Sequence, residues 1–191
     1  LNHPARARLR YDLLALLHRE GWNDFRAWRL DELRSANVRF PVFLRDESTH
    51  EGSLTPLLRS KFEVAAFTGL LRATGYDRSK LIAIEFRDTS DADGYFRKYA
   101  AYIIGDRILA RNLDYGRSWA LKRDDSEFSS SMIDDEHEYV VTNPHQETLR
   151  EIFRIAGIDF GRIDYALSGG KIVTWEINLY PTIVFGSGHV A

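Results

Sequence analysis

The chain has 191 residues, of which 44% are hydrophobic and 28% are charged, and its formal net charge is −2. This composition is typical of a globular protein with enough apolar material for a core, and the charge argues against a general nucleic-acid binder. The absence of cysteine excludes disulfides, thiolate zinc sites and a cysteine nucleophile, and no apolar run is long enough to indicate a membrane span.

A helix is predicted over residues 4–20, because leucines recur at helical spacing on one face. The other face carries Arg6, Arg8 and Arg10, which form either a solvated basic surface or a group from which one arginine reaches a phosphate. Residues 1–37 are expected to form an N-terminal helical segment.

An apolar strand over residues 38–45 ends in the basic residue Arg45, and a loop of small residues follows over residues 48–53. Backbone N–H groups in such a loop can cradle a phosphate. The sequence has no GxxxxGK[ST] motif, which excludes a P-loop site. A phosphate site at this strand end would therefore be of another type.

A helix is predicted over residues 56–74, packed behind this strand. Its buried stripe is expected to contain Phe62, Ala66 and Leu70. A buried strand follows over residues 80–88. Residues 95–111 are expected to form two strands around a turn at Gly105-Asp106, because Gly-Asp between two β-rich runs is a strong hairpin signal.

Residues 112–143 show no clean periodicity, so we expect a long loop or insertion whose acidic runs over 124–138 are solvated or line a substrate channel. A helix is predicted over residues 144–157. Its expected buried residues are Leu149, Ile152, Phe153 and Ala156. The tail over residues 182–191 contains Gly-Ser-Gly and is expected to be mobile.

The stretch over residues 161–181 predicts a hairpin, with a turn that we expect to be centred on Gly170. In that register Asp164 lies opposite Glu176, with Cβ atoms ~5 Å apart. Asn178 then shares the face of Glu176, because side chains alternate along a strand. Three oxygen ligands on one face suit Mg²⁺, although the same pattern fits the polar outer face of an edge hairpin.

The order GIDFGRIDYAL, a short turn and KIVTWEINLYPT resembles the metal-binding end of the ATP-grasp superfamily. In that family an Asp on one strand and an E-x-N pair on the next hold Mg²⁺ against the phosphates of ATP. The resemblance implies that ATP and Mg²⁺ are cofactors and that Asp164, Glu176 and Asn178 are the magnesium ligands.

The same resemblance assigns further roles, in chain order. Arg45 stands where the family usually has a lysine on the α- and β-phosphates, and the loop residues Ser48, Gly52 and Ser53 fold over them. Glu85 and Phe86 flank the adenine, and Asp88 or Asp91 accepts hydrogen bonds from the ribose. Arg97 and Arg111 neutralise the transferred phosphoryl group.

The expected fold is therefore α+β and ATP-grasp-like, with two small lobes built on antiparallel sheets and ATP between them. We expect a central lobe over residues 38–88 and a C-terminal lobe over residues 89–191. The implied function is a ligase that joins a carboxylate to an amine through an acyl-phosphate. The alternatives are a catalytically silent nucleotide-binding module and an ATP-grasp phosphotransferase.

Small-molecule carboxylates and amines are the expected partners, with no nucleic acid and no membrane, in a cytoplasmic setting. The first residue is a leucine rather than methionine, so we expect a fragment, a processed product or the ordered part of a longer protein. An N-terminal domain of the kind that full-length ATP-grasp proteins carry is expected to complete the second substrate site.

Overall fold

The computed structural model describes residues 2–3, 8–49 and 52–181, and within them the chain forms two antiparallel sheets. The helices are α1 (Arg10–Arg19), α2 (Lys61–Ala73), α3 (Ser130–Thr142) and α4 (Gln146–Ala156), with 3-10 turns η1 (Glu32–Arg34), η2 (Arg78–Lys80) and η3 (Arg123–Asp125). The strands are β1 (Ala27–Arg29), β2 (Val42–Asp46), β3 (Leu81–Glu85), β4 (Phe96–Ile104), β5 (Arg107–Gly116), β6 (Phe160–Ser168) and β7 (Lys171–Asn178). The α+β fold with antiparallel sheets agrees with the sequence-based expectation.

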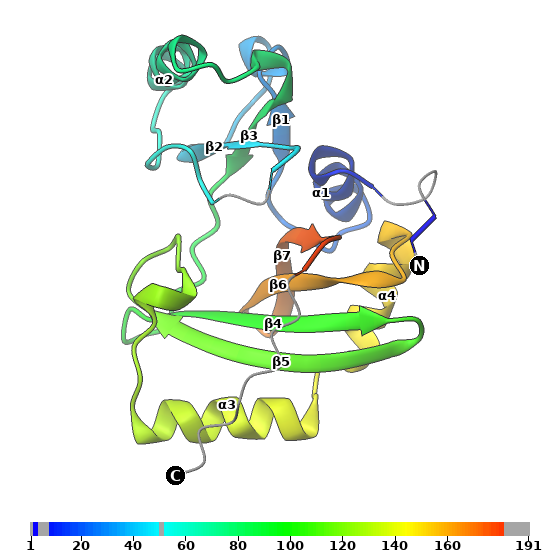
Figure 1. Cartoon of the computed structure of the whole chain (residues 1–191). Helices are drawn as coiled ribbons and strands as arrows, with labels where there is room; N and C mark the ends of the chain where they lie inside the picture. Colours follow the sequence, from blue (N-terminus) through cyan, green and yellow to red (C-terminus); the bar gives the residue numbers. More distant parts are fainter. Residues whose placement is uncertain (1, 4–7, 50–51, 182–191) are drawn as a thin grey trace.

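The smaller lobe contains a three-stranded sheet of order β1-β3-β2, with α2 above it in Figure 1. Every residue of β2 and β3 is buried, because both faces of this sheet are covered. Leu44 and Ala83 pack on the α2 side, whereas Phe43 and Ile82 belong to a second cluster that faces the larger lobe. Strand β1 comes from residues 1–37, so that segment is part of this lobe's sheet.

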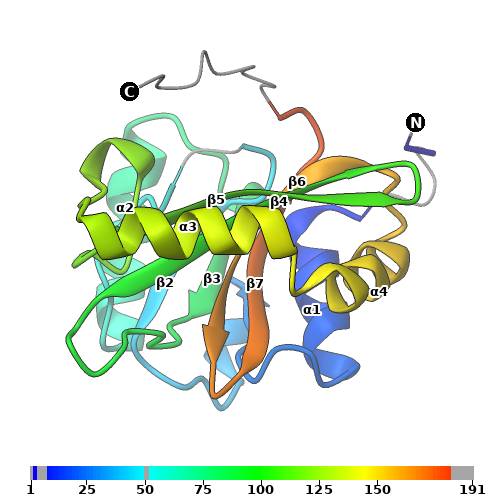
Figure 2. The same ribbon diagram turned by 90° about the horizontal axis from the view of Figure 1, so that it is seen from below.

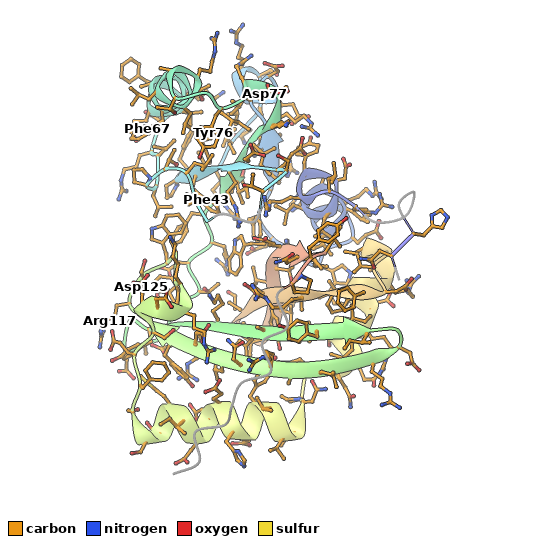
Figure 3. The ribbon with its side chains drawn as sticks, in the orientation of Figure 1. Phe43, Phe67, Tyr76, Asp77, Arg117 and Asp125 are labelled. Atoms are coloured by element: carbon orange, nitrogen blue, oxygen red, sulfur yellow. The ribbon has the colours of Figure 1, made fainter. Side chains whose placement is uncertain are left out.

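Helix α2 turns a different face to the sheet from the one we predicted. Phe62 and Leu70 are 83% and 62% exposed. Val64 and Thr68 are buried instead, and Figure 3 shows Phe67 and Tyr76 between α2 and the sheet. The hydroxyl of Thr68 can be buried because it donates a hydrogen bond to the Val64 carbonyl at 2.7 Å. The helix also begins at Lys61, with Ser60 as its N-cap, rather than at residue 56.

The larger lobe contains a four-stranded sheet of order β5-β4-β6-β7. The β4–β5 hairpin turns at Gly105-Asp106 as predicted, because Ile104 pairs with Arg107. Helices α3 and α4 lie on one face of this sheet, as Figure 2 shows from below. The four buried residues predicted for the α4 helix are confirmed.

Residues 130–142 form helix α3, which corrects the prediction of a loop over residues 112–143. Ser129 caps this helix by accepting a hydrogen bond from the backbone N–H of Met132 at 3.3 Å. Only Tyr139 of α3 is buried. Asp134 and Glu138 are exposed, whereas Asp135 accepts a hydrogen bond from the Tyr115 hydroxyl on β5. Because only one residue of this helix is buried, its sequence has no apolar stripe from which the helix could be predicted.

Helix α1 packs against both lobes. Leu14 contacts the cluster of the smaller lobe, whereas Leu13 and Leu17 join the core of the larger one. The helix begins at Arg10, and residues 4–7 of the predicted helix lie outside the described part. After α1, the Asn23 side chain donates to the Thr174 carbonyl at 2.8 Å and accepts from the Thr174 N–H at 3.1 Å. Asn23 thereby hydrogen-bonds both backbone groups of Thr174 on the open edge of β7 and fixes that strand to the N-terminal segment.

A chain of hydrogen bonds runs through the core of the larger lobe. His145 Nδ1 lies 2.8 Å from the Tyr165 hydroxyl, which donates to the Tyr139 hydroxyl at 3.1 Å. The Tyr139 hydroxyl in turn donates to the Ala100 carbonyl at 2.9 Å. Burial lowers the pKa of His145 and raises that of Tyr139 to about 12, so both side chains are neutral near pH 7.

We expect the stability of the fold to fall as the pH drops through the ordinary histidine pKa of about 6.5. The reason is that the unfolded chain binds a proton at His145 more readily than the folded chain does, so stability is present above that pH and lost below it. Urea titrations between pH 5 and pH 8 measure this. The variant His145→Gln should flatten the dependence, whereas His137→Gln on the exposed side of α3 should leave it unchanged; an equal effect of both contradicts the assignment.

In the described part of the chain, no helix is both long and apolar enough to cross a bilayer.

Candidate active site

The β6–β7 hairpin brings Asp164 opposite Glu176, as predicted. The turn lies at Gly169-Gly170, both with positive φ, and pairs Tyr165 with Thr174. A bulge at Trp175 then adds one residue to β7. The predicted pairing is therefore correct although the predicted turn centre was not, because the bulge shifts the register by one residue.

Two arginines from distant segments hold Glu176. Arg10 Nη2, at the start of α1, lies 3.0 Å from Glu176 Oε1. Arg45 Nη2, on β2, lies 2.6 Å from Glu176 Oε2. The three side chains are only 4%, 9% and 15% exposed, so this ion-pair triad joins α1 and both sheets in a site that is largely shielded from water.

The triad carries one more positive than negative charge. Burial lowers the pKa of Arg10, repulsion by Arg45 lowers it further, and attraction to Glu176 and to the nearby Asp46 carboxylate opposes both effects. Within the described chain, the buried Nε–H of Arg10 has no hydrogen-bond acceptor. An additional anion at this place would accept that hydrogen bond and balance the charge, so the triad favours the binding of a negatively charged group.

Next to the triad, Arg162 and Asp164 form a bidentate ion pair. Arg162 Nε and Nη2 donate to the two carboxylate oxygens of Asp164 at 2.9 Å and 3.3 Å. Desolvation raises the pKa of Asp164, while the charges of Arg162 and Lys98 oppose that shift. Arg162 and Asp164 point to the same face of the sheet because they are two positions apart on β6.

Asn178 lies opposite Arg162 in the register, at the end of β7. Its side-chain oxygen accepts a hydrogen bond from the Tyr180 N–H at 2.8 Å. Asp164, Glu176 and Asn178 thus supply hard oxygen donors on one face, a set suited to Mg²⁺. In residues 2–3, 8–49 and 52–181, however, no three His, Cys, Asp or Glu side chains are grouped to hold a metal ion.

Aromatic side chains line the contact between the lobes beside this site. The Trp119 ring lies 5.0 Å from Phe43 and 5.8 Å from Phe86, measured between ring centroids. Trp175 stacks on Phe25 at 5.7 Å. In Figure 3, Phe43 extends from the smaller sheet toward the larger lobe. Phe25 and Phe43 are buried in this contact, whereas Phe86, Trp119 and Trp175 are half-buried and leave part of their apolar surface open.

Comparison with solved structures identifies the architecture. The chain superposes on D-alanine–D-alanine ligase from Bacillus anthracis with a TM-score of 0.54 at 17% identity, covering 91% of this chain and 56% of the ligase. It superposes on L-amino acid ligase from Bacillus licheniformis with a TM-score of 0.54 at 11% identity, covering 92% and 41%. The D-alanine–D-alanine ligase from Coxiella burnetii gives a TM-score of 0.53 at 17% identity, covering 89% and 47%. All three are ATP-grasp enzymes.

The chain has the ATP-grasp fold. It spans about half the length of the solved structures it matches. No protein-family profile matches the sequence, and no curated protein matches it. The likeness is therefore one of fold alone.

Arg45, predicted as a phosphate ligand, lies in the triad with Glu176, and the loop that follows it is only partly described. Ser48 donates through its N–H and its hydroxyl to Asp46 Oδ1 at 2.7 Å and 2.6 Å. The Ser53 hydroxyl donates to the Thr55 carbonyl at 2.6 Å. Gly52 is exposed, and residues 50–51 lie outside the described part. These turns start and end the loop beside Arg45.

Glu85, predicted to flank the adenine of an ATP-grasp site, has a structural role. Its buried carboxylate accepts hydrogen bonds from the Arg26 N–H, the Trp28 Nε1–H and the Arg39 N–H at 2.9–3.1 Å. The carboxylate is thus occupied in fixing two segments to β3. Phe86 does lie beside the aromatic surfaces, in contact with Trp119.

The two ribose candidates lie further along the chain. Asp88 accepts hydrogen bonds from the Ser90 N–H and hydroxyl, and Asp91 accepts from the Tyr95 N–H. Desolvation tends to raise the pKa of Asp91, but hydrogen bonds from Tyr95 and Asp93 lower it overall. Both aspartates therefore shape the turn between the two lobes.

Arg97 is not brought to the candidate site. It pairs with Tyr115 and lies on the core face of β4 with Tyr99, whereas Ala100, the partner of Asp164, belongs to the other face. The Arg97 side chain is bound to Asp91 at 3.2 Å. Its place near the phosphoryl group, implied by the resemblance, is not supported by the register.

Arg111 is the extra residue of a bulge in β5. Together with Asn112 it opposes Ala100, whose other neighbour is Asp164. Arg111 therefore lies in the same row of the sheet as Asp164, two strands away from it.

Sequence reasoning missed three residues of this candidate site. Arg10 was one of three arginines on a predicted helix, with no signal to choose among them. Trp119 lay in a stretch without periodicity. Arg162 could have been found, because a residue two positions before Asp164 on the same strand must share its face.

The close approach of β6 to β7 at Gly161 fixes the position of Asn178. A Cβ atom added at Gly161 would lie 2.9 Å from the Asn178 carbonyl oxygen. We expect Gly161→Ala to lower the free energy of unfolding by about 1–3 kcal/mol, measured in urea. At Gly69 in α2 a Cβ atom meets nothing within 4 Å, so Gly69→Ala should be neutral or stabilising. Equal stability of the two variants would contradict the tight contact.

Proposed function

We propose that this chain is the nucleotide-binding part of an ATP-dependent ligase that joins a carboxylate to an amine. The observation that carries the proposal is the triad of Arg10, Arg45 and Glu176, which joins both lobes beside the Arg162–Asp164 pair. Two buried arginines on one carboxylate, with an unsatisfied N–H donor, suit a polyphosphate better than they suit a structural ion pair.

ATP fits the residues that are present. Arg10 and Arg45 would hold its phosphates, and the half-buried rings of Phe86 and Trp119 offer aromatic surfaces for the base. The buried N–H of Arg10 supplies a donor that awaits an acceptor. When the phosphates accept from the two arginines, the Glu176 carboxylate no longer has to balance their charge.

Mg²⁺ also fits the donor set of Asp164, Glu176 and Asn178, whose oxygens share one face of the sheet. Bound there, it would neutralise charge on the phosphates. Glu176 becomes available as a ligand only after its arginines have found phosphate oxygens. Nucleotide binding would therefore complete the set of side chains that hold Mg²⁺. We expect ATP and Mg²⁺ to strengthen each other's binding.

The proposed reaction has two steps. A carboxylate oxygen of the acid attacks the γ-phosphorus of ATP, so that an acyl-phosphate forms and ADP leaves. The amine nitrogen then attacks the acyl carbon, inorganic phosphate leaves and the amide loses a proton. Arg162 stabilises the negative oxygens that develop in both steps, and the loop after Arg45 excludes water. Arg111, in the same row of the sheet, is a second candidate for this role.

The chain covers about half of the solved ligases, so the site for the amine is proposed to be completed by a further domain of the same protein. A silent nucleotide-binding module is the second candidate function. It is favoured by one observation: Glu176 is already neutralised by two arginines, which would stabilise the fold without any turnover.

The test is to incubate the chain with ATP, Mg²⁺ and pools of carboxylates and amines and to measure ADP, inorganic phosphate and organic products. A ligase releases phosphate in proportion to amide, and Arg162→Gln abolishes this release while nucleotide binding persists. A phosphoester product without free phosphate would indicate a phosphotransferase. Tight nucleotide binding with no consumption of ATP for any pool would indicate the silent module.

A further inference from the structure

A cavity lies in the smaller lobe, on the α2 side of its sheet. It has a volume of about 420 Å³ and lies between α2, η1 and η2. Its floor is aliphatic and includes Leu30, Leu33 and Val64. Phe43 packs on the opposite side of that sheet, so the sheet separates the cavity from the aromatic surfaces of the candidate active site.

The rim of the cavity is basic. Arg34, Lys61, Arg72 and Arg78 line it, and Arg78 is paired with Asp31 at 2.8 Å. The Lys61 ammonium donates to the carbonyls of Arg34 and Ala36, which holds it at the mouth. Across the described residues, the guanidinium groups of Arg34 and Arg72 have neither an ion-pair nor a hydrogen-bond partner.

Of the nearby carboxylates, Asp31 is ion-paired with one cation of the rim, Arg78, whereas Glu32 and Glu63 are hydrogen-bonded to other groups. Glu32 accepts hydrogen bonds from the Tyr11 hydroxyl and the Arg29 N–H, and Glu63 accepts from the Arg59 N–H. The cavity therefore combines an aliphatic floor with a lining whose charged residues are all cationic.

Gly69 lies in the middle of α2 and lines the same cavity. A glycine inside a helix costs roughly 0.5–1 kcal/mol relative to alanine. No positive φ and no close packing requires it, since an added Cβ atom would meet nothing within 4 Å. The missing side chain leaves the space above the aliphatic floor open, which is a second feature that fits a ligand.

We infer that this cavity binds an aliphatic carboxylate of medium chain length. Arg34 and Arg72 would hold the carboxylate through paired N–H donors, and the chain would cover Leu30, Leu33 and Val64. The floor carries no aromatic ring, so a nucleobase has no stacking surface there. The site is separate from the proposed ATP site and does not depend on the proposed function.

Isothermal titration calorimetry with octanoate on the purified chain tests the inference, with octylammonium as the probe of equal length and opposite charge. We expect saturable binding of one octanoate with a Kd of about 1 mM or below, and no binding of octylammonium. Arg72→Gln should weaken octanoate binding about tenfold, as loss of a charge-assisted hydrogen bond predicts.

Two variants at one position separate blocking from unfolding. Gly69→Leu should abolish octanoate binding by filling the cavity while the thermal transition stays at or above that of the wild type, and Gly69→Ala should retain binding. Phe62→Ser removes an exposed apolar side chain of α2 that does not line the cavity, and it should retain binding as well.

Three results would overturn the inference. They are the absence of octanoate binding to the wild type, equal binding of octylammonium, and octanoate binding that survives Gly69→Leu but is lost in Phe62→Ser. The last result would indicate adsorption to the exposed apolar face of α2 instead of binding in the cavity.

Discussion

Replacement of Glu176 by alanine is expected to lower the free energy of unfolding by about 3–5 kcal/mol. The reason is that Arg10 and Arg45 are almost fully buried and would face each other without a counter-charge. The transition in urea measures the loss. Inorganic pyrophosphate, added without metal, should restore stability to the variant more than it stabilises the wild type, because it can replace the missing carboxylate.

The matched control is Glu147→Ala, which breaks an exposed ion pair with Arg150. Exposed pairs contribute at most about 1 kcal/mol, so this variant should remain close to the wild type. A Glu176→Ala variant that is no less stable than Glu147→Ala, or that does not respond to pyrophosphate, would show that the triad is not the anion site described above.

The second large effect is expected from Arg10→Met. This variant leaves the Arg45–Glu176 pair in place, so the fold should persist, while the nucleotide loses one buried guanidinium contact. A hydrogen bond to a charged group contributes roughly 1.5–3 kcal/mol, which corresponds to a loss in affinity of roughly 10- to 100-fold. Calorimetry with Mg²⁺ and a non-hydrolysable ATP analogue measures this change.

Arg19→Met on the same helix is the control, because the Arg19 side chain is 72% exposed and pairs only with its neighbour Glu20 within the described chain. Its nucleotide affinity should match that of the wild type. Unchanged affinity in Arg10→Met would remove Arg10 from the proposed site and leave Arg45 as the arginine of the triad that binds the nucleotide.

The sequence was informative where local chemistry decides the structure. The Gly-Gly turn and β-branched strands predicted the last hairpin, and the apolar stripe of α4 was right residue by residue. Helix α2 shows the limit. Its sequence offers two apolar stripes, one through Phe62 and one through Val64, and only tertiary packing decides which of them is buried.

The site residues divide in the same way. Asp164 and Glu176 could be paired from a hairpin register, but the partner of Glu176 on α1 is 166 positions away and carries no local signal. Arg97 was assigned to the site although strand alternation puts it on the core face, because the registers of β4 with its neighbours could not be read from the sequence.

The most direct test of the central claim is calorimetric titration of the wild-type chain with a non-hydrolysable ATP analogue, with and without Mg²⁺, alongside Asp164→Asn. We predict one saturable site whose affinity rises strongly with Mg²⁺ in the wild type but not in the variant. At a hundredfold excess over the Kd, the same ligand should stabilise the fold by about 2.7 kcal/mol. Absence of binding, or binding that is indifferent both to Mg²⁺ and to Asp164, would contradict an ATP-grasp nucleotide site in this chain.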